Sequence, residues 1–197
     1  MSEEDRSTWN ERYRDGFYQN RPHPCRLLAH WCKQFHGGRA LDVACGTGRN
    51  SRFLASQGYQ VTALDVSDVA LTKARSTPHP NSSQINYVLR DLDEGLPALG
   101  KFDLIVVVRY LKRELFPILD QHLVAGGHLL VEHHIKYDAD DRPLAGPESP
   151  EYRLDPEELR TLIKNFDVLY EFEGLITDPD GQYAAISQFV GCKSTTV

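Results

Sequence analysis

Short aliphatic segments alternate with amphipathic ones over most of this chain. The aliphatic segments are predicted strands at residues 39–43, 60–64, 85–89, 102–108 and 127–133. Between them, apolar residues recur at the spacing of a helix face over residues 50–57, after Ser67 and over residues 113–122. The alternation predicts a Rossmann-like, doubly wound α/β domain with a mostly parallel sheet and helices on both faces.

Both ends of the chain extend this pattern. Residues 24–35 are predicted to form a helix, and residues 138–152 form a polar loop that is long enough to be functional. A second helix is predicted to begin at Asp155-Pro156-Glu157-Glu158, because Asp suits the cap, Pro the first helical position and Glu the position three after the cap. Residues 168–172 and 184–190 then predict an antiparallel C-terminal edge hairpin, which brings the sheet to seven strands.

Length and charge narrow the class of protein. The chain has 197 residues and a formal net charge of −6, and we expect one domain over residues 1–197. Residues 1–36 would form an N-terminal lid segment and helix, and residues 37–197 the Rossmann-like core. Without a run of Lys or Arg, nonspecific nucleic-acid binding is not expected. A membrane span needs about 20 consecutive apolar residues, and no apolar run in this sequence approaches that length. The sequence also shows no signal-peptide pattern, so we expect a cytoplasmic protein that does not bind membranes.

A glycine loop follows the first predicted strand. It reads Ala44-Cys45-Gly46-Thr47-Gly48, with Asp42 before it and a helix after it. Its glycines allow a ligand to approach the backbone, and Asp65 ends the second strand about 20 residues on, where an acid commonly holds ribose hydroxyls. A dinucleotide site requires a third glycine where this chain has Ser51. Asp42 would repel a pyrophosphate but suits a cofactor that carries an ammonium and a sulfonium.

The loop resembles the Asp/Glu-x-Gly-x-Gly-x-Gly signature of class I S-adenosylmethionine methyltransferases, with Ala44 in place of the first glycine. Alanine fits if its φ is negative, whereas a positive φ would imply a shifted loop. Nearly the whole chain resembles the small bacterial methyltransferases of the tellurite-resistance and thiopurine-methyltransferase type. The matching segments are Trp9 with Arg12-Tyr13, Gly48-Arg49-Asn50-Ser51, Gly58-Tyr59-x-Val61-Thr62, Leu64-Asp65-Val66-Ser67, Tyr110-Leu111 and Ala125-Gly126-Gly127.

The resemblance implies S-adenosyl-L-methionine as the cofactor. Ala44, Gly46 and Gly48 would lie against its methionine part, with Asp42 near the amino group. Asp65 would hold the ribose. The resemblance also implies adenine contacts for Val66, Asp91 and Leu92, and a lid over residues 9–18, with residues 138–152 as the other candidate lid. The remaining predicted cofactor-binding residues are Arg12, Tyr13, Cys45, Asn50 and Val108.

The residues after the fourth and fifth strands would face the transferred methyl group, so Arg109, Tyr110, His133 and His134 are the candidate catalytic residues. Arg109 would either contact an anionic acceptor or form a salt bridge to an acid such as Asp42 or Glu132. Tyr110 suits a pocket wall. Successive side chains on a strand point to opposite faces, so at most one of the two histidines would reach the pocket, and no metal is expected.

Three functions are compatible with these residues. The first is methyl transfer to a small acceptor such as a thiol or an oxyanion, by a monomer or a homodimer. The second is a catalytically silent S-adenosylmethionine-binding module that acts through a partner protein. The third, a nicotinamide-dependent oxidoreductase, is disfavoured by Ser51 and Asp42.

Overall fold

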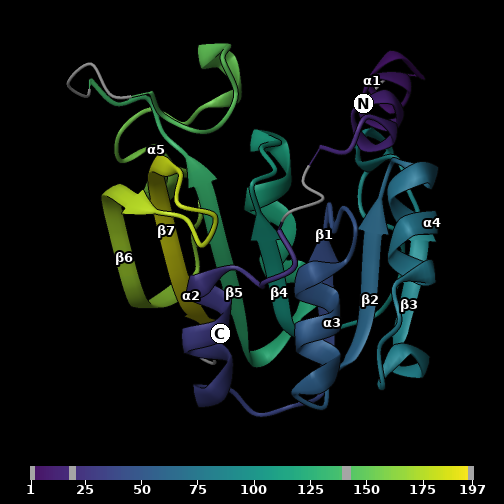
Figure 1. Cartoon of the computed structure of the whole chain (residues 1–197). Coiled ribbons are helices and arrows are strands. Elements are labelled where there is room, and N and C mark those ends of the chain that lie inside the picture. The colour runs from purple at the N-terminus through teal and green to yellow at the C-terminus, as the bar shows by residue number, and fades with distance from the viewer. Residues whose placement is uncertain (1–2, 18–20, 139–142, 195–197) are drawn as a thin grey trace.

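A computed structural model describes residues 3–17, 21–138 and 143–194 of the chain (Figure 1). Residue 18, the last of the predicted lid, and residues 139–142 of the second candidate lid lie outside this description. The strands are β1 (Arg39–Val43), β2 (Gln60–Asp65), β3 (Ile85–Leu89), β4 (Phe102–Val108), β5 (Leu123–His134), β6 (Phe166–Thr177) and β7 (Tyr183–Lys193). The helices are α1 (Glu3–Arg14), α2 (Arg26–Trp31), α3 (Arg49–Ser56), α4 (Asp68–Ser76) and α5 (Glu158–Leu162).

The seven strands form one sheet in the order β3-β2-β1-β4-β5-β7-β6. Strands β1 to β5 pair in parallel, whereas β7 is antiparallel to both of its neighbours. The predicted fold class is therefore confirmed, with the C-terminal hairpin at one edge. Within that hairpin, β7 lies inside the sheet and β6 forms the edge (Figure 1).

Helices and loops bury both faces of the sheet. One apolar cluster joins Leu28 of α2, Leu54 of α3 and Leu71 of α4 to alternate residues of the strands. The other cluster packs Phe116 and Leu159 against the opposite face. Because β1, β2, β4 and β5 are buried on both sides, their polar residues gather at their ends, and their carboxyl ends share one edge (Figure 1). Strands β3 and β6 are only partly buried.

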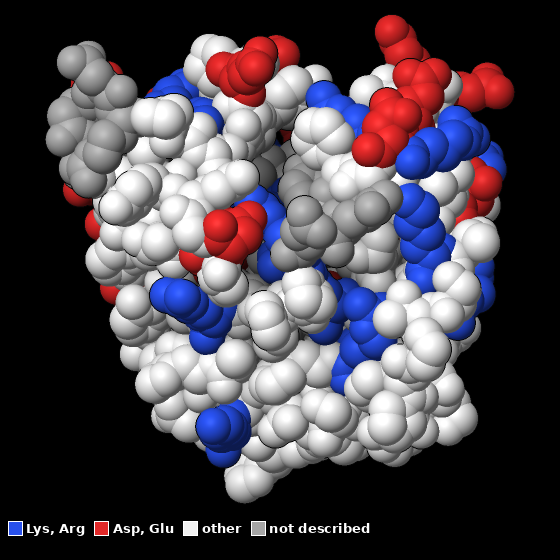
Figure 2. All heavy atoms as spheres, viewed as in Figure 1, with Lys and Arg blue, Asp and Glu red and all other residues white. Residues whose placement is uncertain are grey.

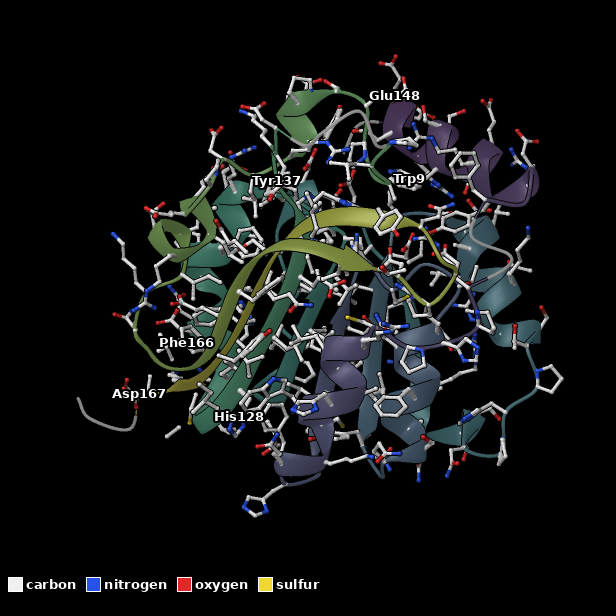
Figure 3. All side chains as sticks on the ribbon, turned by 60° about the vertical axis from the view of Figure 1, so that its left-hand side comes forward. Trp9, His128, Tyr137, Glu148, Phe166 and Asp167 are labelled. Carbon is white, nitrogen blue, oxygen red and sulfur yellow. The ribbon has the colours of Figure 1, made fainter. Side chains whose placement is uncertain are left out.

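Side chains mark the two ends of the sheet clearly. Trp9, Tyr137 and Glu148 lie toward the edge formed by the carboxyl ends of the parallel strands, whereas His128, Phe166 and Asp167 lie at the opposite end (Figure 3). The glycine loop, the helix α1 and the β6–β7 turn also belong to the first edge (Figure 1). No helix in the described part of the chain is long and apolar enough to cross a membrane.

Three elements differ from the prediction. Residues 3–14 form a helix that the polar, aromatic pattern did not indicate. Residues 113–122 form a 3₁₀-helix, η4 (Arg113–His122), instead of an α-helix. Pro117 lies inside it and has no amide hydrogen to donate to a preceding carbonyl.

The helix predicted to begin at Asp155 begins instead at Glu158. Glu157 has a φ of 62°, which interrupts a regular helix there. The Glu158 carboxylate still accepts a hydrogen bond from the Asp155 amide at 2.8 Å, as in a capping box, and it also pairs with Arg113. The hydrogen bond between the Asp155 amide and the Glu158 side chain was therefore predicted correctly, but it stabilises a turn that precedes the helix. In the described part of the chain, four short 3₁₀ turns, Cys32–Gln34, Ser82–Gln84, Leu92–Glu94 and Pro150–Tyr152, lie in the connections.

Candidate cofactor and acceptor sites

The glycine loop between β1 and α3 has three residues in the left-handed backbone region. The φ angles are 55° at Ala44, 56° at Gly46 and 75° at Gly48. Ala44 thus has the positive φ for which a shifted loop was expected, and it bears a strain of about 1 kcal/mol that glycine would avoid. The three positions coincide with those of the glycines in the signature, so the signature describes the backbone conformation that this loop adopts.

Asp65 braces this loop from the end of β2. Its side chain is buried and accepts hydrogen bonds from the Gly46 amide at 2.7 Å and the Ser67 amide at 2.8 Å. Burial raises the pKa of Asp65 to about 6, and the two amides oppose that rise. Each carboxylate oxygen can accept a further hydrogen bond. Asp65 therefore lies at the loop with acceptor capacity left for hydroxyl donors.

Asp42 lies beneath the loop at the end of β1, with 1% of its surface exposed. Its Oδ2 accepts a hydrogen bond from Ser51 Oγ at 2.6 Å, whereas its Oδ1 has no partner among the described residues. Burial raises the pKa of Asp42 to about 7, although the Ser51 hydroxyl and the Arg49 charge oppose the rise. An unsatisfied buried carboxylate oxygen is costly, and a donor or a cation at the loop would relieve that cost. The acid therefore suits a cationic cofactor.

The residues predicted to contact adenine follow the ends of β2 and β3. Asp91 caps a short 3₁₀ turn, Leu92–Glu94, and its side chain accepts a hydrogen bond from the Asp93 amide at 2.8 Å. Tyr110 is near Asp65 and Asp91, and burial together with these two acids raises its pKa. Val66 is buried beside them, whereas the Leu92 side chain is fully buried in the core. The structure brings the predicted residues to one region, with Tyr110 on its side.

Helix α1 covers the glycine loop from above. A Cβ atom built on Gly46 would lie 2.7 Å from the Tyr13 hydroxyl, so the tyrosine tip rests on the loop. Asn10 holds the helix to α4: it accepts a hydrogen bond from Ser67 Oγ at 2.7 Å and donates one to Asp68 at 2.8 Å. Arg12 is exposed, and its guanidinium lies 5.0 Å from the centre of the Trp9 ring. Tyr13 therefore meets the predicted site, and Arg12 lies on the outer side of the helix.

The three remaining predicted cofactor residues are buried around the loop. The amide nitrogen of Cys45 donates to the Leu64 carbonyl at 2.9 Å, and burial raises the pKa of the Cys45 thiol. Asn50 Oδ1 accepts a hydrogen bond from the Cys25 amide at 2.9 Å, which ties the segment before α2 to α3. Val108 packs among the apolar residues beneath β4's end. Their contacts in this structure hold the loop in place.

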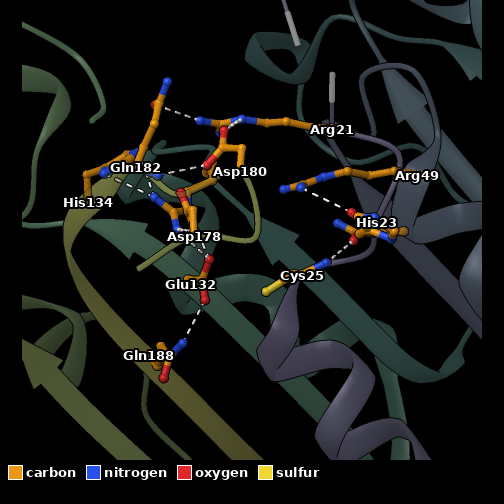
Figure 4. Close-up of polar contacts among 12 residues, drawn as sticks. Arg21, His23, Cys25, Arg49, Glu132, His134, Asp178, Asp180, Gln182 and Gln188 are labelled. Carbon is orange, nitrogen blue, oxygen red and sulfur yellow. Dashed lines mark hydrogen bonds and ion pairs between the residues drawn. The ribbon is translucent and has the colours of Figure 1, made fainter. Parts of the chain in front are cut away.

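Arg109 follows β4 and has a φ of 59°. Its guanidinium donates to Glu132 at 2.9 Å and to Asp178, from the β6–β7 turn, at 3.0 Å (Figure 4). Gln188 of β7 donates to the other Glu132 oxygen at 2.6 Å. Of the two acids named from the sequence, Glu132 is the partner of Arg109, and no hydrogen bond or ion pair joins Asp42 to Arg109 in the described structure. Asp178 was not predicted, because its Asp-Pro-Asp-Gly setting indicates only a turn.

The rings of the two histidines at the end of β5 lie close together, with their centroids 5.8 Å apart and their planes at 76°, whereas strand geometry had predicted side chains on opposite faces. His134 Nε2 lies 2.9 Å from a nitrogen of Arg109, while His133 Nε2 lies 2.9 Å from the Tyr152 carbonyl. Burial lowers the pKa of His133 to about 4 and that of His134 to about 2, and the Arg109 charge adds to both shifts. Both rings are therefore neutral near pH 7. No group of three His, Cys, Asp or Glu side chains in the described ranges could hold a metal ion.

Comparison with known proteins agrees with this geometry. Residues 40–127 match the family model described as "Methyltransferase domain". A TehB of Haemophilus influenzae, described as a probable S-adenosyl-L-methionine-dependent methyltransferase, is 28% identical over 138 residues, which are 66% of this chain and 46% of TehB. An uncharacterized methyltransferase of Schizosaccharomyces pombe is 36% identical over 66 residues, covering 34% of this chain and 46% of its own length. This chain thus spans less than half the length of the curated relatives that it matches.

Solved structures share the fold. The crystal structure of TehB from Haemophilus influenzae superposes with a TM-score of 0.67 and 23% identity, covering 85% of this chain and 61% of TehB. The glycopeptide N-methyltransferase MtfA, solved with S-adenosylhomocysteine, superposes with a TM-score of 0.61 and 19% identity over 84% of this chain and 88% of MtfA. At these identities the likeness concerns the fold alone.

Proposed function

Because this chain contains a class I S-adenosylmethionine-dependent methyltransferase domain that resembles TehB, we propose that the protein transfers a methyl group to a small-molecule acceptor. The observation that carries the proposal is the acid pair at the glycine loop. The Asp65 carboxylate accepts a hydrogen bond from the Gly46 amide and can accept further ones. The Oδ1 atom of Asp42 is buried without a partner in the described structure. Together they suit a ligand with hydroxyl donors and a positive charge.

When bound, S-adenosylmethionine supplies an electrophilic methyl group, and the residues of this chain would bind and orient it. Asp65 would hold the ribose and the loop 44–48 the methionine part, while Tyr13 and α1 cover the loop. Burial keeps the His133 and His134 rings neutral, and each ring already has a partner: the Tyr152 carbonyl for His133 and the Arg109 guanidinium for His134. We therefore propose that catalysis rests on positioning. The acceptor would then bind already in its nucleophilic, deprotonated form, such as a thiolate or an oxyanion.

Two further expectations belong to this proposal. The protein would act in the cytoplasm as a monomer or homodimer, and its acceptor would be neither a nucleic acid nor a membrane lipid. The net charge of −6 supports the exclusion of nucleic acid, because phosphate backbones are bound mainly through basic surfaces.

Calorimetry and turnover test the proposal separately. We expect the purified protein to bind S-adenosylhomocysteine and not NADH, and to form S-adenosylhomocysteine from S-adenosylmethionine when offered a panel of thiols and oxyanions. Binding without turnover on any acceptor would favour the silent binding module. Tight binding of NADH with no binding of S-adenosylhomocysteine would overturn the cofactor assignment and with it the methyltransferase proposal.

A further inference from the structure

A small hollow lies beside Arg49, the residue that follows the glycine loop. Its lining residues are Arg21, His23, Arg49, Asp178, Pro179 and Asp180. They come from three distant parts of the chain: the segment before α2, the first residue of α3, and the β6–β7 turn (Figure 4). On this face of the molecule, Lys and Arg side chains lie around its centre, and Asp and Glu side chains lie mainly along its upper margin (Figure 2).

The charges around the hollow are paired with one exception. Arg21 donates to Asp180 at 2.7 Å and to Gln182 at 3.0 Å. Asp178 is paired with Arg109, as described above. Both acids of the turn are therefore engaged by other arginines. Arg49 donates only to the His23 carbonyl, at 3.2 Å, and it has no carboxylate partner in the described part of the chain.

The backbone around Arg49 fixes the position from which its side chain extends. It is the first residue of α3 and follows Gly48, whose left-handed conformation ends the glycine loop. Its neighbour Asn50 bonds the Cys25 amide, so the segment that carries His23 is tied to the same turn. The guanidinium thus lies between the loop and the β6–β7 turn (Figure 4). One nitrogen of the guanidinium donates a hydrogen bond to the His23 carbonyl, and the remaining N–H groups can reach a ligand in the hollow.

We infer that Arg49 binds a carboxylate or another small oxyanion in this hollow, and that the acceptor brings it. The inference rests on the proposed function, because the hollow adjoins the loop on which the cofactor would lie. A guanidinium without an acidic partner is suited to such groups, since its fork matches two oxygens at once. The only other ligand expected at this loop with the same chemistry is the carboxylate of the cofactor itself. Arg49, and not Arg109, would then select for an anionic acceptor, because Arg109 already holds two carboxylates.

The test compares the wild-type protein with Arg49→Gln. Arg26→Gln is the matched control: it removes the same charge from an exposed residue of α2 whose side chain makes no hydrogen bond or ion pair to the described residues. Amide chemical shifts are followed by NMR during titration with sodium acetate and with sodium sulfate, at constant ionic strength set with sodium chloride. Titrations are run with and without S-adenosylhomocysteine. Calorimetry measures the affinities for S-adenosylhomocysteine and for 5′-methylthioadenosine, which lacks the amino acid carboxylate.

We expect the amides of residues 48–50 to shift saturably in the wild type and in Arg26→Gln, and the anion affinity to fall about ten-fold or more in Arg49→Gln. Unchanged S-adenosylhomocysteine affinity in that variant would assign the anion to the acceptor. A loss of S-adenosylhomocysteine affinity, with 5′-methylthioadenosine unaffected, would assign it to the cofactor and overturn the acceptor role. No saturable anion shift in the wild type, or equal shifts in Arg49→Gln, would overturn the whole inference. A wild type that binds anions but not S-adenosylhomocysteine would instead refute the proposed function.

Discussion

Replacing Arg109 by glutamine should destabilise the fold more than any ordinary surface substitution. Its guanidinium pairs with Glu132 at 2.9 Å and Asp178 at 3.0 Å, and the three side chains are only 13%, 4% and 11% exposed. Without it, two buried carboxylates would share one site with no cation between them. Removing one partner of a buried ion pair typically costs about 3–5 kcal/mol. The residual exposure of Arg109 and Asp178 places the expected loss near the lower value.

The assay is thermal and urea unfolding of the purified variant. For a domain of about 150–250 residues, each kcal/mol shifts the melting temperature by about 2–4 °C, so a loss of about 3 kcal/mol corresponds to roughly 6–12 °C. Arg160→Gln is the control. Its pair with Glu171 is 3.3 Å long with side chains 52% and 42% exposed, and an exposed pair contributes at most about 1 kcal/mol. If Arg109→Gln melted like the wild type while turnover was lost, Arg109 would act on the acceptor and the structural explanation would be wrong.

Three other perturbations probe the cofactor half of the site. Burial raises the pKa of Asp42 to about 7 in the folded protein, so ionisation of Asp42 disfavours the folded state. Asp42→Asn should therefore become more stable relative to the wild type as the pH rises from 4 to 7, by up to about 1.4 kcal/mol per pH unit. An equal difference in unfolding free energy between the two proteins at pH 4 and pH 8, measured with urea, would contradict this. Asp65→Ala should weaken S-adenosylhomocysteine binding by about 1.5–3 kcal/mol in calorimetry, and unchanged affinity would mean that the ribose lies elsewhere. Asn10→Ala should speed hydrogen exchange in α1 and remove the protection that S-adenosylhomocysteine is expected to add there; equal protection with and without ligand in the wild type would make α1 purely structural.

Much of the cofactor half could be predicted because its information is local. The loop 44–48 and Asp65 belong to adjacent strand ends, and parallel pairing of β1 with β2 brings them together. The left-handed angles at Ala44, Gly46 and Gly48 follow from the same short motif. The 3₁₀ form of η4 could have been anticipated from Pro117. The helix α1 was missed because its apolar stripe is weak: Asn10 and Tyr13 are the only buried residues described in it.

The acceptor half could not be predicted to the same depth, because the residues that build it are far apart in the sequence. Arg109 and Asp178 are 69 positions apart, and Arg21 and Asp180 are 159 apart. They meet because β7 inserts between β5 and β6, which carries the β6–β7 turn to the carboxyl ends of the parallel strands. A hairpin pattern predicts that such a turn exists, but its place in the strand order decides which side chains it reaches.

Because the cofactor half is built from local residues and the proposed acceptor half from distant ones, substitutions should affect the two halves differently. The cofactor half depends on backbone conformation and on two acids, so a change there alters the loop itself. The proposed acceptor half would depend on side chains presented by a turn and by the segment before α2, whose pairing leaves Arg49 without a carboxylate partner among the described residues. Exchanging charges in the turn would therefore alter the hollow while leaving the contacts of Asp42 and Asp65 in place. Under this proposal, acceptor preference would depend on how the hairpin tip and the segment 21–25 pair with one another. Only the assembled fold reveals that, among the described residues, this pairing leaves Arg49 without a carboxylate partner.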